Sequence, residues 1–425
     1  MVRRTRPRLA FALTLGLGTF LAPTATAAGR LWIVGTSTCP GVHFTTVQQA
    51  VDAATDGDVI LVRPTTSEDP GFTIDGKSLA IVGDERGAVR VKFASIRDLA
   101  AQQSALLLGL SAGQLRVTDN RGAVWIEDCS FAAFGGAAVM KQSTDVLMSR
   151  CSITGGGWSV PGSSPGEVGL SVSTSRVTMV DCTVTGGIGS SGYRPFGFPT
   201  PGQPGGDGIH VANGQLILNG TSVTGGLGGW GYPQIFTYCT PGGAGGDAIR
   251  HDPLSTIYLV DADVTPGSGG PGGPGALGPS CPSGRPGIAF RGTGAVHFLP
   301  GQARSLTSRR VILEREAVPL DFAGIAGDVA WLLFSFEQEP TFWLPLGGTV
   351  GPRLPGEQLL VGTLPPSGSL STSAWIPPGV VEPHHAQLVF AQGVHVDHIG
   401  QPWLGAPIAW VILDEGHDPD DGCSP

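Results

Sequence analysis

The sequence predicts an all-β protein in which a right-handed parallel β-helix with an N-terminal helical cap is followed by an antiparallel β-sandwich. Three observations lead to this prediction. A short β-rich phrase recurs between residues 124 and 290, a Gly/Pro-rich insertion interrupts each repeat at the same point, and the apolar periodicity ends near residue 304. The corresponding regions are 28–303 for the β-helix and 304–415 for the sandwich.

The recurring phrase has five copies that share one pattern of apolar residues. They are VWIEDCSF (124–131), VLMSRCSITGG (146–156), VTMVDCTVTGG (177–187), LILNGTSVTGG (216–226) and IYLVDADVTPG (257–267). Strands this short bury little apolar surface alone, so we expect them to stack into one continuous column. Alternation with period two predicts that an inward-facing column contains Ile126, Met148, Met179, Leu218 and Leu259.

The insertions change in length while the phrases around them do not. Equivalent positions in successive copies, Cys129, Cys151, Cys182, Thr221 and Ala262, are 22, 31, 39 and 41 residues apart. The added residues fall at 154–167, 185–206, 225–246 and 266–286, and nearly all are uncharged and rich in Gly and Pro. Because strands anchor both ends of each insertion, we expect ordered or semi-ordered loops on one side of the column.

Residues 1–27 have the composition of a secretory signal peptide. Four arginines precede an apolar run at 9–21, and Ala25-Thr26-Ala27 resembles a cleavage site. Its removal would change the net charge from -9 to -13, with 21 basic and 34 acidic residues remaining. We therefore expect a secreted protein, extracellular or periplasmic, with no membrane span in the mature chain. The acidic balance and the three lysines argue against nucleic acid as a partner.

A short helix is expected before the first strands of the column. Thr45 and Gln48 have capping-box spacing, and Val47, Ala50 and Val51 share one face. The segment TTVQQAVDAATDGDVILVRP (45–64) resembles the N-terminal cap of the right-handed parallel β-helix proteins of the pectate-lyase-like superfamily. The resemblance implies this fold over roughly residues 31–300. It implies no activity, because that scaffold carries lyases, hydrolases, epimerases and adhesins. The Asn-Thr-Asp, Gly-His-Gly and Arg-Ile-Lys phrases of its polygalacturonases do not occur here.

Beyond residue 304, strand-like runs such as 311–322, 328–336 and 385–396 alternate with Pro/Gly turns. They predict a compact sandwich, which we expect to cover the C-terminal end of the column. Residues 416–425 form an acidic tail. Of the cysteines, Cys239 and Cys281 lie late in adjacent insertions, which makes them candidates for a disulfide in an exported chain.

Aromatic residues are concentrated in the insertions, where an apolar core does not need them. Aromatic faces in a charge-poor groove suit stacking on the C–H faces of sugar rings, which gives the hypothesis of polysaccharide binding. In the alternative, the rings pack on their own glycines and order the loops. The candidates are Trp158, Tyr193, Phe198, Trp230, Tyr232 and Tyr238.

Asp207 and Asp247 occupy equivalent positions one repeat apart, so their carboxylates could lie about 5 Å from each other. This spacing is compatible with a calcium site, with a retaining glycosidase pair, or with general acid/base catalysis that includes His210. In the structural alternative, each Asp hydrogen-bonds turn backbone. The repetition favours that alternative, because stacked repeats duplicate structural devices whereas a catalytic site is usually unique.

A third cluster lies in the predicted sandwich. His395 and Asp397 would share a strand face, with His398 next to them, and imidazoles at this density could hold zinc. The alternative is a polar hairpin without metal.

Taken together, the sequence favours a monomeric, non-catalytic, extracellular structural or adhesive module without a cofactor. Its expected partner is a polysaccharide or another cell-surface component, bound on the loop side. The alternative is a polysaccharide lyase or glycoside hydrolase with its carboxylates at Asp207 and Asp247.

Overall fold

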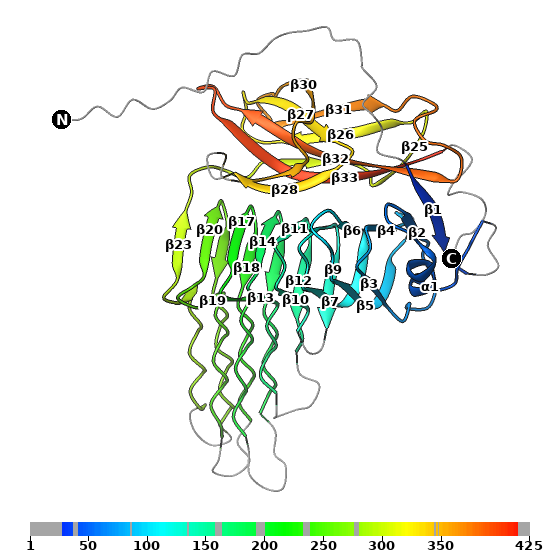
Figure 1. The fold of residues 1–425 in the computed structure, drawn as a ribbon. Coiled ribbons are helices and arrows are strands. Elements are labelled where there is room, and N and C mark those ends of the chain that lie inside the picture. Colours follow the sequence, from blue (N-terminus) through cyan, green and yellow to red (C-terminus); the bar gives the residue numbers. More distant parts are fainter. Residues whose placement is uncertain are drawn as a thin grey trace.

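The computed structural model describes residues 28–36, 41–85, 87–133, 136–157, 164–192, 200–232, 239–275, 280–343, 346 and 348–414. The protein is all-β, with long parallel sheets in the first part of the chain and mainly antiparallel sheets in the last part (Figure 1). The predicted signal peptide and acidic tail lie outside the described residues. No helix within the described ranges is long and apolar enough to cross a membrane.

The first long sheet receives one short strand from each repeat, and neighbouring strands are parallel. We call the parallel strands of the two long sheets, which lie between residues 29 and 298, the stack; the insertions between these strands are not part of it. The strands of this sheet are β1 (Gly29–Val34), β2 (Val59–Val62), β4 (Leu79–Gly83), β6 (Ser104–Leu108), β8 (Ala123–Glu127), β11 (Asp145–Ser149), β14 (Arg176–Val180), β17 (Gln215–Asn219), β20 (Thr256–Val260) and β23 (Ala295–Phe298).

The second long sheet has two arms that meet at β7. One arm holds β3 (Phe72–Asp75), β5 (Val89–Arg97), β7 (Leu110–Thr118), β10 (Ala138–Lys141), β13 (Leu170–Ser173), β16 (Ile209–Ala212), β19 (Ile249–His251) and β22 (Phe290–Gly292). The other holds β9 (Ser130–Ala133), β12 (Ser152–Gly155), β15 (Thr183–Thr185), β18 (Ser222–Thr224) and β21 (Asp263–Thr265).

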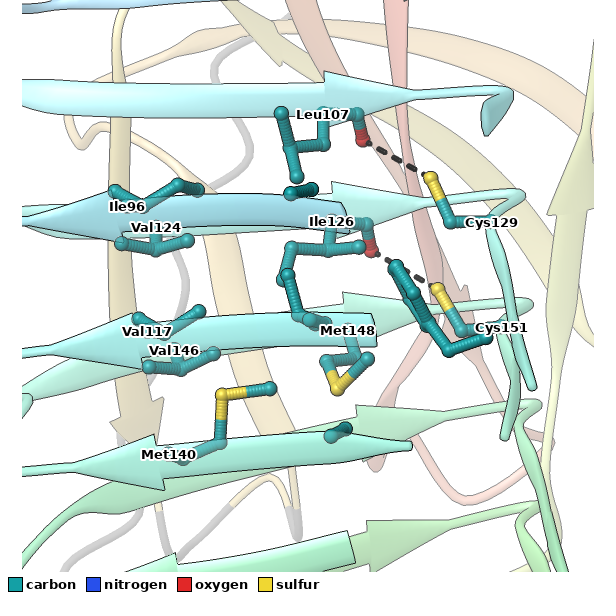
Figure 2. Close-up of a cluster of buried hydrophobic side chains, with 14 of the residues drawn as sticks. Ile96, Leu107, Val117, Val124, Ile126, Cys129, Met140, Val146, Met148 and Cys151 are labelled. Atoms are coloured by element: carbon teal, nitrogen blue, oxygen red, sulfur yellow. Dashed lines mark hydrogen bonds between the residues drawn. The ribbon is translucent and has the colours of Figure 1, made fainter. Parts of the chain in front are cut away.

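The predicted inward column is confirmed. Met148 is in register with Met179, Met179 with Leu218, and Leu218 with Leu259. These four side chains and Ile126 are at most 3% exposed and belong to one apolar cluster that runs along the stack. Figure 2 shows Ile126 and Met148 pointing into this interior beside the cysteine side chains.

Each repeat leaves the first sheet through a corner residue in the left-handed backbone region. At the equivalent positions Asp128, Arg150, Asp181, Gly220 and Asp261, φ lies between 48° and 58°. Asp and Gly tolerate this conformation, whereas Arg does so only where its surroundings fix the backbone. Arg150 is held by ion pairs to Asp128 and to the buried Glu127, which combine with the backbone bonds of the stack to fix this corner.

The single α-helix of the described residues, α1 (Val47–Ala53), lies at the N-terminal end of the stack (Figure 1). Its Val47, Ala50 and Val51 are buried, as predicted. The predicted cap is wrong by one residue, because Thr46 is the N-cap and its Oγ1 accepts from the N–H of Gln49. Gln48 instead bonds Asp52 and the backbone of Thr73, which fastens the helix to β3.

The C-terminal part forms sheets that pack face to face around a second apolar cluster, which includes Phe322, Leu332 and Trp410. One group of strands continues the first long sheet, because β32 pairs with β1; it contains β25 (Val311–Leu313), β27 (Val329–Ser335), β30 (Glu357–Thr363), β32 (His385–Val396) and β33 (Pro402–Leu413). The other sheet contains β24 (Ser305–Thr307), β26 (Ala317–Ala323) and β31 (Ser369–Trp375). The strands β28 (Gln338–Trp343) and β29 (Gly348–Pro352) form a separate pair.

The expected position of this C-terminal region is wrong. It lies along the outer face of the first long sheet rather than over the C-terminal end of the stack (Figure 1). Trp125 of β8 packs on Phe390 of β32 with ring centroids 5.1 Å apart. The physical reason is that outward side chains of the first sheet, such as Leu106 and Leu147, are apolar and need a partner layer.

Candidate functional site

The insertions form the largest feature outside the stack. They leave the ends of β12, β15, β18 and β21 and return to β13, β16, β19 and β22, as extended hairpins lying side by side (Figure 1). We call the described parts of these hairpins, residues 186–192, 200–206, 225–232, 239–246, 266–275 and 280–287, the hairpin array.

Exposure along the hairpin segments other than 280–287 follows a period of three. In the segment 225–231, the pairs of glycines are buried, while Leu227 and Trp230 are 51% and 67% exposed. The same order of two inward residues and one outward residue places Ile188 and Pro271 on the surface. Three residues per turn without hydrogen bonds inside the segment is the geometry of a polyproline II helix.

Hydrogen bonds between segments arrange the array in two layers. In the outgoing layer, Gly189 and Gly228 donate to the carbonyls of Leu227 and Ser268, each at 2.9 Å. In the returning layer, Gly205 donates to Ala244 at 2.8 Å in the same manner. The layers are joined by the remaining glycines: Gly226 donates to Gly206, and Gly246 to Gly226, both at 2.8 Å.

Close packing of these backbones explains the glycine. A Cβ on Gly226 would lie 1.9 Å from the carbonyl oxygen of Gly187, and one on Gly229 would lie 2.0 Å from that of Ser190. The outward residue of each triplet offers its carbonyl but not its N–H to these bonds, so proline fits there, as at Pro241 and Pro271. These segments, which the sequence predicts to be ordered or semi-ordered loops, are therefore fixed by hydrogen bonds and close packing of their backbones.

The disulfide candidate lies in the returning layer. Cys239 and Cys281 are bonded, with their Cα atoms 5.9 Å apart, and join two adjacent hairpins. The bond constrains the part of the array farthest from the strands, where few side chains are available for packing.

The outward face of the outgoing layer carries no charge and combines exposed apolar side chains with the hydroxyls of Ser191 and Ser268. Its residues include Ile188 (47% exposed), Leu227, Trp230, Ser268 and Pro271. Of the predicted aromatic candidates, Trp230 lies on this face and Tyr232 is half-buried. Trp158, Tyr193, Phe198 and Tyr238 fall outside the described residues. Ile188 and Leu227 were not among the predicted residues, although the repeated Gly-Gly-X phrase at 225–231 indicates an outward residue at every third position.

A ladder of hydroxyl side chains adjoins this face. Thr185 pairs in register with Thr224, and Thr224 with Thr265, immediately before the chain enters the array. Two residues earlier on the same strand face, Thr183 pairs with Ser222, and Ser222 pairs with the exposed carboxylate residue Asp263. The surface therefore changes from hydroxyl-rich to apolar along each repeat.

Asp207 and Asp247 are both buried where the array joins the stack, and each is bound by its neighbours. Oδ1 of Asp207 accepts the N–H of Asp247 at 3.1 Å, and its Oδ2 lies 2.9 Å from Nε of Arg250. Asp247 repeats the pattern: Oδ1 accepts the N–H of Ile288 at 3.0 Å and Oδ2 pairs with Arg291. The pKa of Asp207 is raised overall, because the effect of burial exceeds the opposing effects of Arg250 and of the Asp247 N–H.

These contacts support the structural interpretation of the acid pair, in which each Asp ties its own repeat to the next one. They differ from the expected Asp turn, because the bonded backbone belongs to the following repeat. His210 is half-buried and pairs in register with Arg250. The carboxylates are thus committed to cross-repeat bonds, which leaves little freedom for proton transfer.

The histidine cluster of the C-terminal region does not converge on one point. His395 is fully buried near Arg304 and Asp328, and burial lowers its pKa to about 4. Asp397 instead closes a turn, accepting the N–H groups of Ile399 and Gln401 and the indole N–H of Trp403. His398 is exposed. Within the described ranges, no group of three or more His, Cys, Asp or Glu could hold a metal ion.

A cleft of about 650 Å³ lies between the stack and the C-terminal region. Gln103, Arg121 and Phe336 are among its lining residues. Arg353 is paired there with Glu337. Asp145, another lining residue, is paired with Arg176, so both residues are engaged in ion pairs within the protein.

Comparisons with known proteins give no family for this chain. No family model matches it, and no curated protein matches it. Among solved structures, it is similar to a superoxide reductase (neelaredoxin) from Ignicoccus hospitalis at 10% identity and a TM-score of 0.15, covering 27% of this chain and 80% of that one. Likeness at this level carries no argument about fold or function.

Proposed function

We propose that the chain is an exported, non-catalytic contact module that binds polysaccharide on the outward face of its hairpin array. In this proposal the stack is a right-handed parallel β-helix of the pectate-lyase-like type, and residues 304–415 are a β-sandwich domain. In this arrangement the β-helix is a rigid support, and the hairpin array is the contact surface. The expected setting is extracellular or periplasmic.

The observation that carries the proposal is Trp230, an indole 67% exposed on a segment whose glycines are locked by hydrogen bonds on both sides. Leu227 and Ile188 continue the apolar surface across neighbouring hairpins. Isolated exposed apolar residues are ordinary on proteins, but a contiguous apolar patch on a fixed backbone is typical of a binding surface.

The regular spacing of this face suits a chain of repeating units. Outward residues recur about every 9 Å along a segment, because a polyproline II helix rises about 3.1 Å per residue. The adjoining hydroxyls, such as Thr185 and Thr224, can exchange hydrogen bonds with sugar hydroxyls while Trp230 and Leu227 contact the C–H faces. Since the backbone is already ordered, binding costs little conformational entropy.

The absence of charge on this face favours a neutral polysaccharide over an acidic one. Ile188, Leu227, Trp230, Ser268 and Pro271 offer no cation to pair with uronate or sulfate groups. An acidic polymer would require basic side chains, and because lysine does not occur after Lys141, these would all have to be arginines.

The alternative, a polysaccharide lyase or glycoside hydrolase at Asp207 and Asp247, has less support. Each carboxylate is buried and accepts a backbone N–H of the next repeat. A retaining pair would need one acid to protonate a leaving group and the other to attack the sugar, both from positions open to substrate.

The test is a binding screen on immobilised neutral and acidic polysaccharides, followed by an assay for new reducing ends and unsaturated products. We expect binding of a neutral polymer without product formation, and at least a tenfold loss in Trp230→Ala. Trp375→Ala is the matched control, because Trp375 is 62% exposed on the C-terminal region. Undiminished binding by Trp230→Ala would contradict the proposed surface, and product formation abolished by Asp207→Asn would favour the enzyme.

A further inference from the structure

The two ends of the stack are covered to different degrees. At the N-terminal end, α1 buries Val47, Ala50 and Val51 against the interior. At the C-terminal end, β21, β22 and β23 are the last strands of their sheets, and no described strand pairs with their outer edges. The C-terminal region does not reach over this end, because it packs along the side of the first sheet (Figure 1).

Burial in the last repeat shows that its interior positions are open. Phe298 stands in register with Leu259, yet Leu259 is 3% exposed and Phe298 is 74% exposed. Ile249 and Ile257 are fully buried, whereas their partners Phe290 and Val296 are only half-buried. No residue between positions 288 and 300 is buried.

This end therefore combines exposed apolar side chains with unpaired strand edges. The apolar group includes Ile288 (46% exposed), Phe290, Val296 and Phe298, and the rings of Phe290 and Phe298 meet edge to face with centroids 6.0 Å apart. Open edges of this kind pair readily with another strand, and proteins normally protect them.

Neither end of the described chain is close enough to cover this surface. Gly29 of β1 pairs with Ala386, and Ala386 pairs with Leu413 of β33. The chain thus enters and leaves the described structure at the opposite, N-terminal edge of the first sheet. Within the described residues, the chain therefore supplies no cover for this end of the stack.

A second copy of this chain presents a matching surface. Its own last repeat offers the same unpaired strand edges and the same exposed apolar side chains, and a two-fold axis perpendicular to the stack would set the facing strands antiparallel. Head-to-tail stacking is blocked because α1 occupies the other end. The remaining arrangement joins two C-terminal ends about a two-fold axis, which gives a closed dimer rather than a filament.

We infer that the protein forms a two-fold dimer through the open C-terminal ends of its stacks. The edges of β21, β22 and β23 pair with those of the second copy, and the Phe290 and Phe298 rings become buried between the two interiors. This inference departs from the monomer expected from the sequence, and it does not depend on polysaccharide binding.

The experiment is light scattering coupled to size-exclusion chromatography on the mature chain over a dilution series. We expect twice the mass of one chain for the unaltered protein and the mass of one chain for Phe298→Glu, with unchanged circular dichroism. Trp375→Glu, which adds the same charge at an equally prominent apolar residue on the C-terminal region, should remain dimeric.

Amide hydrogen exchange provides a second measurement that needs no variant. Peptides covering residues 288–298 should be protected at high protein concentration and lose protection on dilution, whereas peptides from β14 should not change. A monomeric mass throughout the series, a Phe298→Glu protein as dimeric as the parent, or concentration-independent exchange in 288–298 would overturn the inference.

Discussion

The main-chain N–H of Asp247 donates a 3.1 Å hydrogen bond to Oδ1 of Asp207, the residue at the same position one repeat earlier. Asp247 in turn accepts the N–H of Ile288, and this residue has no carboxylate with which to continue the series. The series therefore ends with the last hairpin, as expected for a device that joins consecutive repeats. Asp207 and Asp247, for which the sequence allowed a catalytic role, thus have a structural explanation.

Replacing Asp247 tests this explanation directly. Asp247→Ala leaves the N–H of Ile288 and the guanidinium of Arg291 without their partner, so we expect a loss of about 2–3 kcal/mol in the free energy of unfolding. Asp247→Asn keeps an acceptor oxygen and should lose less. Urea unfolding measures both, with Glu357→Ala as an exposed control. Equal stability of Asp247→Ala and the parent would contradict the structural role.

The hairpin array gives a second prediction, based on steric exclusion. A methyl group on Gly226 would collide with the backbone of Gly187, and no side-chain movement relieves the contact. Gly226→Ala should therefore destabilise the protein by about 1–3 kcal/mol or more. The neighbouring Leu227→Ala, at an outward position, should stay within about 0.5 kcal/mol.

The measurement for this pair is the urea midpoint together with amide exchange of residues 200–206. In Gly226→Ala, the N–H groups of the returning layer should lose protection, whereas Leu227→Ala should keep it. Similar effects of the two substitutions would mean that the glycines do not pack as closely as their hydrogen bonds indicate.

A third prediction concerns the internal column of cysteines. Cys182 Sγ lies 3.3 Å from the carbonyl oxygen of Val180 and accepts the N–H of Cys151 at 3.4 Å. One repeat later, Thr221 makes the equivalent contacts through Oγ1, including acceptance of the Cys182 N–H. Figure 2 shows the same orientation for Cys129 and Cys151, whose thiols reach the carbonyls of Leu107 and Ile126.

A threonine should therefore replace Cys182 with little loss. We expect Cys182→Thr to change the free energy of unfolding by less than about 1 kcal/mol. Valine has nearly the same shape as threonine but no acceptor for the N–H of Cys151, so Cys182→Val should lower the free energy of unfolding by about 1–3 kcal/mol. Urea unfolding of the two variants compares them. A valine variant as stable as the threonine variant would show that the column depends on packing alone.

The parts of the fold that depend on local periodicity were predictable from the sequence. Met148 and Met179 face inward because strand alternation and the repeat fix their positions. The position of the C-terminal region was not predictable, because its contact is made by outward residues such as Leu147, which resemble ordinary strand residues in the sequence. Glu127 illustrates the same limit: its charge suggests a surface, but it is buried beside Trp125 and Arg150.

The candidate site was predictable only in part. Trp230 was recognised because an aromatic residue in a glycine-rich insertion is unusual. The two-layer arrangement of the array was not predicted. A Gly-Gly-X repeat indicates packed polyproline II segments only if neighbouring segments exchange hydrogen bonds, and the sequence does not show which segments are neighbours. The sequence predicted ordered or semi-ordered loops, and the structure shows that their order arises from hydrogen bonds between repeats.

The fourth prediction concerns His395, which lies in the C-terminal region with neither ring nitrogen hydrogen-bonded to the described residues. Burial, reinforced by Arg304 and only partly opposed by Asp328, lowers its pKa from 6.5 to about 4. The folded protein therefore favours the neutral ring. Above pH 6.5 the ring is neutral in both the folded and the unfolded state, and His395 causes no loss of stability. As the pH falls from 6.5 through the folded-state pKa, the unfolded state gains a proton more readily, and the free energy of unfolding decreases by up to about 3 kcal/mol, since one pKa unit corresponds to about 1.36 kcal/mol.

His395→Leu should consequently flatten the dependence of stability on pH between 6.5 and 4, although the packing against Gly324 and Gly393 will set its absolute stability. His398→Leu, at the exposed end of the same hairpin, should keep the slope of the parent. Urea midpoints measured across this pH range for the three proteins give the comparison. The slope is the informative quantity, because repacking around a new side chain shifts stability equally at every pH, whereas only the loss of a titrating group changes how stability varies with pH.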